Sequence, residues 1–228
     1  MSGAPDGPCG GRDGCGCDPF AAIFDRRTAE HDRDRYRKKG PDPTTRQLLE
    51  LIRPYCSPGS TVLDIGGGVG IVDRSLLTVG AGHAVLVDAS RAYLDVARQE
   101  ARIGGMLDRM EFVEGDFVRE AAAIDRADLV TLDRVVCCYA DMEQLVALST
   151  QRANVAYGLV LPRERRGTRW VMSAMNLWHR LRGRTYRFHV HSNARIDAIA
   201  AVAGLHPRGE RLTWIWRVVV YDRSAPAS

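Results

Sequence analysis

From Thr61 onward, short apolar runs alternate with longer segments in which apolar residues recur at helical spacing. The runs have the length of buried strands, and Ser90 is a suitable N-cap for one of the helices between them. Such an alternation predicts a mostly parallel sheet with helices on both faces. The predicted strands are 61–65, 83–87, 110–114, 127–132 and 155–161, and the predicted helices between them are 69–78, 90–103 and 141–153.

The segments before Thr61 predict a tail and two helices. Residues 1–19 are rich in Gly, Pro and Asp, a composition typical of flexible tails. One helix is predicted over 20–39 and a second begins near Pro43, with Leu48, Leu49, Ile52 and Tyr55 on one side. We therefore expect a tail and helical arm over 1–40 and a main domain over 41–223.

The alternation changes after Pro162. A basic amphipathic helix is predicted over 168–182, and a strand-like segment over 186–191 precedes a helix from Ser192 to Ala203. The segments 212–216 and 217–221 predict an antiparallel pair at the sheet edge. The apolar stripe expected on the basic helix consists of Val171, Met172, Met175, Trp178 and Leu181.

A glycine-dense turn, Gly66-Gly67-Gly68-Val69-Gly70, follows the first predicted strand. Glycines there allow a ligand to approach the backbone closely, and Asp88, after the second strand, can accept hydrogen bonds from both ribose hydroxyls. The turn does not fit the dinucleotide pattern G-x-G-x-x-G, whose last glycine is replaced by Ile71 or Asp73, depending on the starting glycine. An adenosine-type cofactor other than NAD is therefore predicted.

The pattern Asp64-x-Gly66-x-Gly68-x-Gly70 resembles the first motif of the class I S-adenosylmethionine-dependent methyltransferases, and Gly115-Asp116-Phe117 resembles their third motif. The resemblance implies a Rossmann-like α/β fold, with a mostly parallel seven-stranded sheet that ends in an antiparallel hairpin. It also implies an enzyme that uses S-adenosylmethionine. Asp64 would hold the methionyl end, Asp88 the ribose and Asp116 the adenine amino group. The full set of expected cofactor contacts is Asp64, Gly66, Gly67, Gly68, Gly70, Asp88, Ala89, Asp116, Phe117 and Asp133.

The segment after the fourth strand, Cys137-Cys138-Tyr139-Ala140, is similar in position to the acceptor motif of the magnesium-protoporphyrin O-methyltransferase branch, although it lacks that branch's histidine and proline. The expected catalytic residues are Tyr139, His189 and Tyr36. Two alternatives stay open: Tyr36 closes over the cofactor or packs on the helix over 44–55, and His189 with His191 serves the reaction or borders a core strand. We expect no metal site, since Cys15-Gly16-Cys17 lacks zinc-site spacing.

The acceptor is expected to be a small molecule, and O-methylation of an apolar acidic compound is favoured. Eight arginines and one glutamate lie between Pro162 and Arg187, so the basic helix could form a lid over an anionic acceptor, contact a membrane surface or pack on the core. A nucleic-acid acceptor is disfavoured because the fourth motif lacks an N-P-P-Y-like element. A non-catalytic cofactor-binding scaffold is the rival from another class. A cytoplasmic location with reduced cysteines is expected, because no apolar run or signal sequence is evident.

Overall fold

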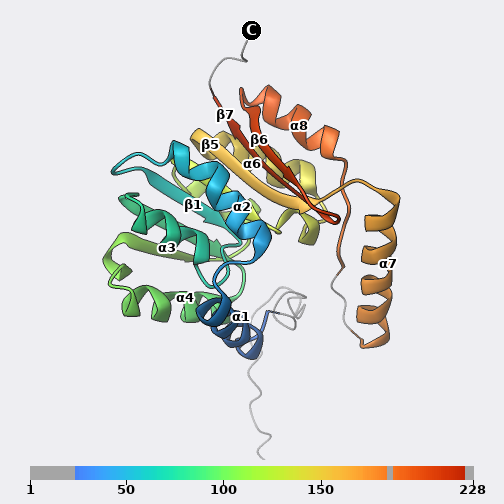
Figure 1. The fold of residues 1–228 in the computed structure, drawn as a ribbon, viewed down its shortest axis with the longest axis horizontal. Helices are drawn as coiled ribbons and strands as arrows, with labels where there is room; N and C mark the ends of the chain where they lie inside the picture. Colours follow the sequence, from blue (N-terminus) through green and yellow to red (C-terminus); the bar gives the residue numbers. More distant parts are fainter. Residues whose placement is uncertain (1–23, 184–186, 224–228) are drawn as a thin grey trace, which may run out of the picture.

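A seven-stranded sheet forms the centre of the computed structural model, which describes residues 24–183 and 187–223 (Figure 1). The strand order is β3-β2-β1-β4-β5-β7-β6. Strands β1 to β5 pair in parallel, whereas β7 is antiparallel to both β5 and β6. This confirms the expected sheet. The strands are β1 (Thr61–Ile65), β2 (His83–Asp88), β3 (Met110–Glu114), β4 (Ala127–Asp133), β5 (Ala153–Pro162), β6 (His206–Leu212) and β7 (Trp216–Asp222).

Helices cover both faces of the sheet, as parallel pairing requires. Apolar residues of α2, α3 and α4 pack on one face, and those of α5, α6 and α8 pack on the other. Each fully buried Leu or Ile stabilises the fold by roughly 1.5–3 kcal/mol, so the two clusters hold the strand ends in fixed positions. The helices are α1 (Arg26–Lys39), α2 (Pro43–Ile52), α3 (Ile71–Thr78), α4 (Arg91–Ile103), α5 (Phe117–Glu120), α6 (Met142–Arg152), α7 (Arg166–Leu181) and α8 (Asn193–Val202).

The C-terminal hairpin differs from the predicted one. Its strands are β6 and β7, while Thr213–Ile215 forms the turn, so the strand expected over 212–216 is wrong. The outer strand β6 is rich in charged and polar residues and is largely exposed. Edge strands of this kind carry charges that prevent pairing with other chains, and the apolar alternation that signals a buried strand is missing.

Three other predicted segments have different bounds. Helix α1 begins at Arg26, because Asp25 is its N-cap and accepts a hydrogen bond from the Thr28 amide at 2.8 Å; residues 20–23 lie outside the described part. Helix α3 begins at Ile71 because Gly70 has a φ of +71°. Residues 187–191 form no strand, although Phe188 and His189 make backbone contacts described below, and Tyr186 lies outside the described residues.

Helix α7 buries only part of the expected apolar stripe. Its buried residues are Thr168, Met172 and His179, whereas Leu181 of the predicted stripe is largely exposed. The helix stands at the outer edge of the molecule, beyond the ends of β5 and β7 (Figure 1). In the described residues no helix has the length and apolar character needed to cross a membrane.

Candidate active site

The glycine turn follows β1, which lies between β2 and β4 in the sheet. The strand order reverses at this point. Ligands of open α/β sheets bind at this point. Gly66, Gly68 and Gly70 have φ values of +66°, +59° and +71°, which favour glycine over other residues. A Cβ atom at Gly66 would lie 2.5 Å from a methyl carbon of Val135, so this position also lacks space for a side chain.

Asp88 ends β2 beside the glycine turn. Its carboxylate accepts hydrogen bonds from the amide of Gly68 at 3.0 Å and from the amide of Ser90 at 2.8 Å. Burial raises the pKa of Asp88 to about 6, although the two amide hydrogen bonds oppose the shift. The residue is half-buried, and its predicted ribose contact stays a prediction.

Asp64 lies beneath the glycine turn and is 1% exposed. It accepts a hydrogen bond from the Thr131 hydroxyl at 2.6 Å, and its second oxygen faces the carboxyl group of Asp73. No third residue in the described part donates to that oxygen of Asp64 or to either oxygen of Asp73. Burial raises the pKa of Asp64 to about 7 and that of Asp73 well above its ordinary value. The two carboxyl groups therefore share a proton near neutral pH. Asp73 was not predicted from the sequence. It could have been recognised as an acidic residue among the core positions Val72, Leu76 and Leu77 of α3.

Asp116 follows β3 and has two partners. Its carboxylate accepts from the Val118 amide, as an N-cap of α5, and from the Tyr139 hydroxyl at 2.7 and 2.8 Å. Burial and this carboxylate raise the pKa of Tyr139, so its hydroxyl stays protonated and donates. The side chain of Phe117 is buried in the core. The predicted adenine contacts of Asp116 and Phe117 stay predictions, as does the cofactor contact of Ala89.

The segment after α7 brings both predicted histidines to the end of β4. The His189 amide donates to the Cys137 carbonyl at 2.7 Å, and a ring nitrogen of His191 lies 2.8 Å from the Tyr139 carbonyl oxygen. The two imidazole rings stack with centroids 5.5 Å apart. Burial, followed by the charges of His191 and Arg187, lowers the pKa of His189, so its imidazole is neutral at pH 7. Tyr139, His189 and His191 thus form one group.

Helix α1 crosses the same edge near Asp88. The Ser90 hydroxyl donates to the Phe24 carbonyl at 2.6 Å, and the Tyr93 hydroxyl donates to Asp32 at 2.7 Å. Tyr36 stacks under the guanidinium group of Arg74, whose ε nitrogen donates to the Gly70 carbonyl. Tyr36 is therefore joined to the glycine turn through Arg74, and its catalytic role stays a prediction.

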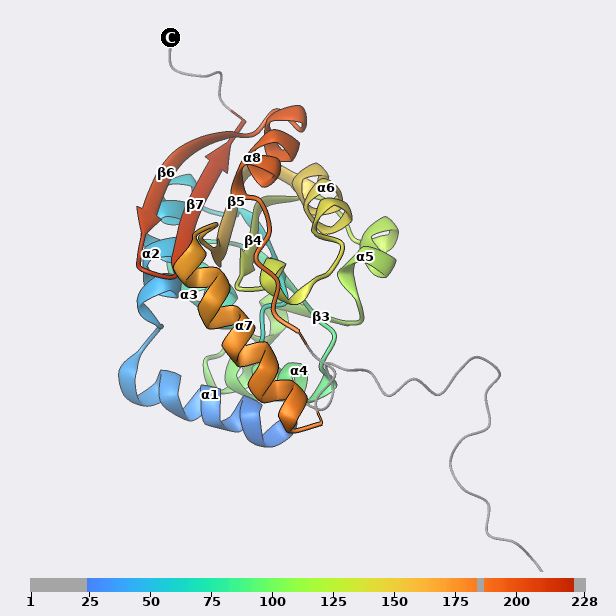
Figure 2. The same ribbon diagram turned by 90° about the vertical axis from the view of Figure 1, so that its right-hand side faces the viewer.

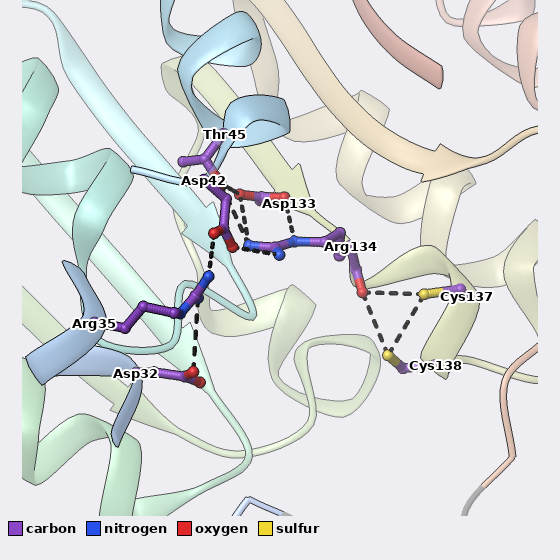
Figure 3. Close-up of polar contacts among 8 residues, drawn as sticks. All are labelled: Asp32, Arg35, Asp42, Thr45, Asp133, Arg134, Cys137 and Cys138. Atoms are coloured by element: carbon purple, nitrogen blue, oxygen red, sulfur yellow. Dashed lines mark hydrogen bonds and ion pairs between the residues drawn. The ribbon is translucent and has the colours of Figure 1, made fainter. Parts of the chain in front are cut away.

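Arg134, which follows β4, connects this edge to the helical arm (Figure 3). Its guanidinium donates to Asp42 at 2.9 Å and to Asp133 at 3.0 Å, and Arg35 pairs with Asp42 from the other side. Asp133 also accepts from the Thr45 hydroxyl of α2, so its carboxylate is engaged by α2 and Arg134. The φ of Arg134 is +64°, a value that L residues rarely adopt. No local signal in the sequence indicated this residue.

An Arg134→Ala variant should loosen the attachment of the arm. The substitution leaves Asp42 and Asp133 without a shared cation while the backbone stays in the same strained region, so we expect a loss of about 1–2 kcal/mol in the free energy of unfolding. Amide hydrogen exchange in α1 and the start of α2 should accelerate. Arg26→Ala, which removes an exposed pair with Glu30, is the matched control; equal effects of both variants would contradict the prediction.

Two cysteines line the same loop. The Sγ atoms of Cys137 and Cys138 lie 3.8 Å apart, and each lies within hydrogen-bonding distance of the Arg134 carbonyl oxygen (Figure 3). The hydrogen bond with Cys138, followed by burial, raises the pKa of the Cys137 thiol, which makes a reactive thiolate unfavourable. Cys9, Cys15 and Cys17 lie outside the described residues. Within the described ranges no group of three His, Cys, Asp or Glu side chains is arranged to hold a metal ion.

The arrangement fits an S-adenosylmethionine-type ligand. The glycine turn offers backbone without side chains, Asp88 offers a carboxylate at the next strand end, and Asp116 offers another one strand further. All three lie at the carboxyl edge of the parallel strands, and the Tyr139 group lies at the end of β4 beside them. Adenine, ribose and methyl acceptor could thus be held in that order along one edge, at the ends of β3, β2 and β4.

Comparisons with known proteins identify the domain. Residues 62–156 match a family described as "Methyltransferase domain". The ribosomal protein L11 methyltransferase of Pelotomaculum thermopropionicum is 31% identical over 124 residues, which cover 53% of this chain and 39% of that protein. The one from Carboxydothermus hydrogenoformans is 25% identical over 126 residues, covering 55% and 41%. The chain therefore spans about two fifths of these curated relatives.

Solved structures share the fold across most of the chain. Magnesium protoporphyrin IX methyltransferase from Synechocystis PCC 6803, with bound SAH, has a TM-score of 0.65 at 19% identity and covers 89% of this chain and 99% of its own. An O-methyltransferase family protein from Burkholderia thailandensis has a TM-score of 0.66 at 18% identity, covering 91% and 64%. Residues 62–156 thus match a methyltransferase domain, and the chain as a whole shares the fold of these solved methyltransferases, including the strand order around the glycine turn.

Proposed function

We propose that this protein transfers a methyl group from S-adenosylmethionine to a small-molecule acceptor, by O-methylation of an apolar, acidic compound. The observation that supports the proposal is the position of Tyr139, His189 and His191 after β4, the strand that neighbours β1 and its glycine turn in the sheet. A cofactor site and a cluster of proton-exchanging side chains at the same edge suit group transfer better than a passive scaffold.

The chemistry requires little from the protein if the acceptor is a carboxylate. When bound, S-adenosylmethionine would supply an electrophilic methyl group on a positively charged sulfur. A carboxylate acceptor is already ionised at neutral pH, so orientation supplies most of the rate. A phenol or amine acceptor would need a base, and the neutral imidazole of His189 can accept that proton. Tyr139 would act as a hydrogen-bond donor, since its raised pKa prevents it from serving as the base.

A protein acceptor is the second candidate, because the relatives named above are called ribosomal protein L11 methyltransferases. Their matched region covers about half of this chain and less than half of their own length. The family match, 62–156, includes the strands that would carry the cofactor but ends before α7 and the histidine segment. The likeness therefore bears on cofactor binding more than on the acceptor.

Radiolabelled methyl transfer separates the alternatives. The full chain is incubated with methyl-labelled cofactor and, in separate reactions, with a small-molecule extract, purified L11 protein or total RNA. Label in an organic-soluble product supports the proposed O-methylation. Base-labile label indicates a methyl ester, and base-stable label is expected for a methyl ether. Label in L11 or RNA assigns another acceptor, and binding of the cofactor without any transfer favours the scaffold.

A His189→Asn variant tests which acceptor chemistry operates. For a phenol or amine, we expect kcat to fall by about 100-fold with KM little changed, because general-base assistance is lost. The acidic limb of the parent's pH profile, which arises as His189 becomes protonated, should disappear in the variant. For a carboxylate acceptor, kcat should change by less than about threefold, since no proton is removed. His206→Asn, in edge strand β6, is the matched control.

A further inference from the structure

Helix α7 carries an apolar stripe on the side opposite its buried residues. Thr168, Met172 and His179 define the buried side. About half a turn away at helical spacing lie Trp170, Leu177 and Leu181, with exposed fractions of 77%, 57% and 79%. Figure 2 shows α7 running along the outside of the molecule. A row of large apolar side chains in solvent marks a surface that contacts something else.

Trp214, from the turn between β6 and β7, continues this stripe. It is 66% exposed, and its ring lies 3.6 Å from the position that a Cβ atom of Gly167 would occupy. Gly167 follows the same helical spacing as Trp170 and Leu181, so Trp214 lies on the outer side at the start of α7. We call Trp170, Leu177, Leu181 and Trp214 the outer face.

Arginines flank the outer face without acidic residues among them. Arg166, Arg180 and Arg182 are exposed, and the sequence contains no Asp or Glu from Arg165 to Arg187. The guanidinium of Arg182 lies 4.0 Å from the centre of the Trp178 ring, and Trp178 is itself partly exposed. Helices that lie at the surface of an anionic bilayer have this composition, with tryptophan and leucine on one face and arginine beside it.

A small pocket at the start of α7 adds an independent observation. It is lined by Arg165, Arg166, Gly167, Thr168 and Trp214. Thr168 is 2% exposed, and its hydroxyl has no hydrogen-bond partner among the described residues. The helix begins there without a side-chain N-cap, so amides of its first turn also lack a capping acceptor. The helix N-terminus and the two guanidinium groups at this pocket suit the oxygens of a phosphate group.

We propose that the outer face of α7 lies on a bilayer containing anionic phospholipids, and that the pocket at its start receives a lipid phosphate. A second copy of the chain is a poor occupant, because two such faces would bring their arginines together without counter-charges. A nucleic acid would pair with the arginines but would leave the Leu177 and Leu181 side chains in water. The bilayer accommodates both the apolar stripe and the positive charge.

The inner side of α7 connects this surface to the acceptor region. The side chain of Asn176 exchanges two hydrogen bonds with the backbone of Phe188, at 2.7 and 2.8 Å. His189 follows Phe188 directly, so α7 backs the segment that carries both histidines. An apolar acceptor could then pass from lipid to the site over a short path. This consequence rests on the proposed function, whereas lipid binding itself does not.

Vesicle sedimentation of the full chain tests the proposal. The protein should bind vesicles of phosphatidylcholine with phosphatidylglycerol, bind weakly to phosphatidylcholine alone, and show a blue-shifted tryptophan emission on binding. The triple variant Trp170→Ser, Leu177→Ser and Leu181→Ser should not bind the vesicles. The matched control, Ile103→Ser with Val202→Ser, replaces exposed apolar residues outside α7 and should bind like the parent. Because both sets are exposed, unchanged circular dichroism melting is expected for each.

The charge contribution is tested separately. Arg165→Ala with Arg166→Ala should weaken binding to the anionic vesicles by about thirtyfold and leave binding to phosphatidylcholine alone unchanged. Soluble glycerol phosphate that displaces the protein from vesicles at micromolar concentration would assign the pocket to a free phosphate and overturn the lipid assignment. The whole proposal would be overturned if the parent did not bind vesicles. It would also be overturned if the parent formed dimers in solution and the triple variant did not.

Discussion

Asp88→Ala should bind S-adenosylhomocysteine about 100-fold more weakly than the parent, because hydrogen bonds to a charged group contribute roughly 1.5–3 kcal/mol each. The carboxylate also accepts from the amides of Gly68 and Ser90. The substitution therefore removes the predicted ribose acceptor and leaves two amides of the ligand-facing turns without a partner. Titration calorimetry of the full chain measures the affinity directly.

Asp95→Ala is the matched control for this variant, because Asp95 is an exposed aspartate on α4 that forms an ion pair with Arg98. Affinity should also fall as the pH drops through about 6, where the Asp88 carboxylate becomes protonated and is a weaker, uncharged acceptor. The pH dependence should be lost in Asp88→Ala. Equal affinities of Asp88→Ala, Asp95→Ala and the parent would remove the basis of the cofactor site.

The central sheet and the glycine turn could be predicted because their signals are local. A run such as Thr61–Ile65 records its burial in its own composition, and the spacing from Gly70 to Asp88 follows from one helix and one strand. Parallel pairing then brings the strand ends to a common edge, whichever residues follow them. The positions of Asp64, Asp88 and Asp116 were therefore predictable, although their partners were not.

The partners depend on contacts between distant segments. Arg134 joins Asp42 across 92 residues, and His191 meets Tyr139 across 52. Neither contact leaves a periodic pattern in the sequence. The outer face of α7 could not be predicted for a different reason. Apolar residues follow helical spacing on two sides of this helix, and the sequence does not indicate which side packs on the core. The interpretation of a single stripe assigned Leu181 to the wrong side.

Asp73→Asn should make the stability of the protein less sensitive to alkaline pH. In the parent, the folded state holds protons on Asp64 and Asp73 that the unfolded chain releases near pH 4. Both folded-state pKa values are raised, so this pair contributes stability that is fully present below about pH 4 and is lost as the pH rises through about 7 and beyond. The asparagine amide can donate to Asp64 permanently, which removes one ionisation and lowers the pKa of the other.

Urea unfolding at pH 5, 7 and 8 measures the effect. Between pH 5 and pH 8, Asp73→Asn should lose about 2 kcal/mol less unfolding free energy than the parent, since one pKa unit corresponds to about 1.4 kcal/mol. Asp88 also titrates in this range. The test therefore compares the pH dependence of the unfolding free energy in the variant with that in the parent, and does not use the slope of either profile alone. Asp95→Asn, at an exposed site, should follow the parent. Parallel pH profiles for Asp73→Asn and the parent would contradict a shared proton.

The same variant bears on the predicted contact of Asp64 with the methionyl end of the cofactor. Asp64 lies directly beneath Gly67, where an added Cβ atom would be 2.6 Å from its carboxylate oxygen. An asparagine at position 73 should keep Asp64 ionised at pH 7, and a full negative charge under the turn attracts an ammonium group more strongly than a half-protonated pair does. S-adenosylhomocysteine should then bind more tightly to Asp73→Asn at pH 7, while adenosine, which lacks the ammonium group, should bind as it does to the parent. A gain for both ligands would instead indicate a general stiffening of the turn, and no gain for either would leave Asp64 with a purely structural role.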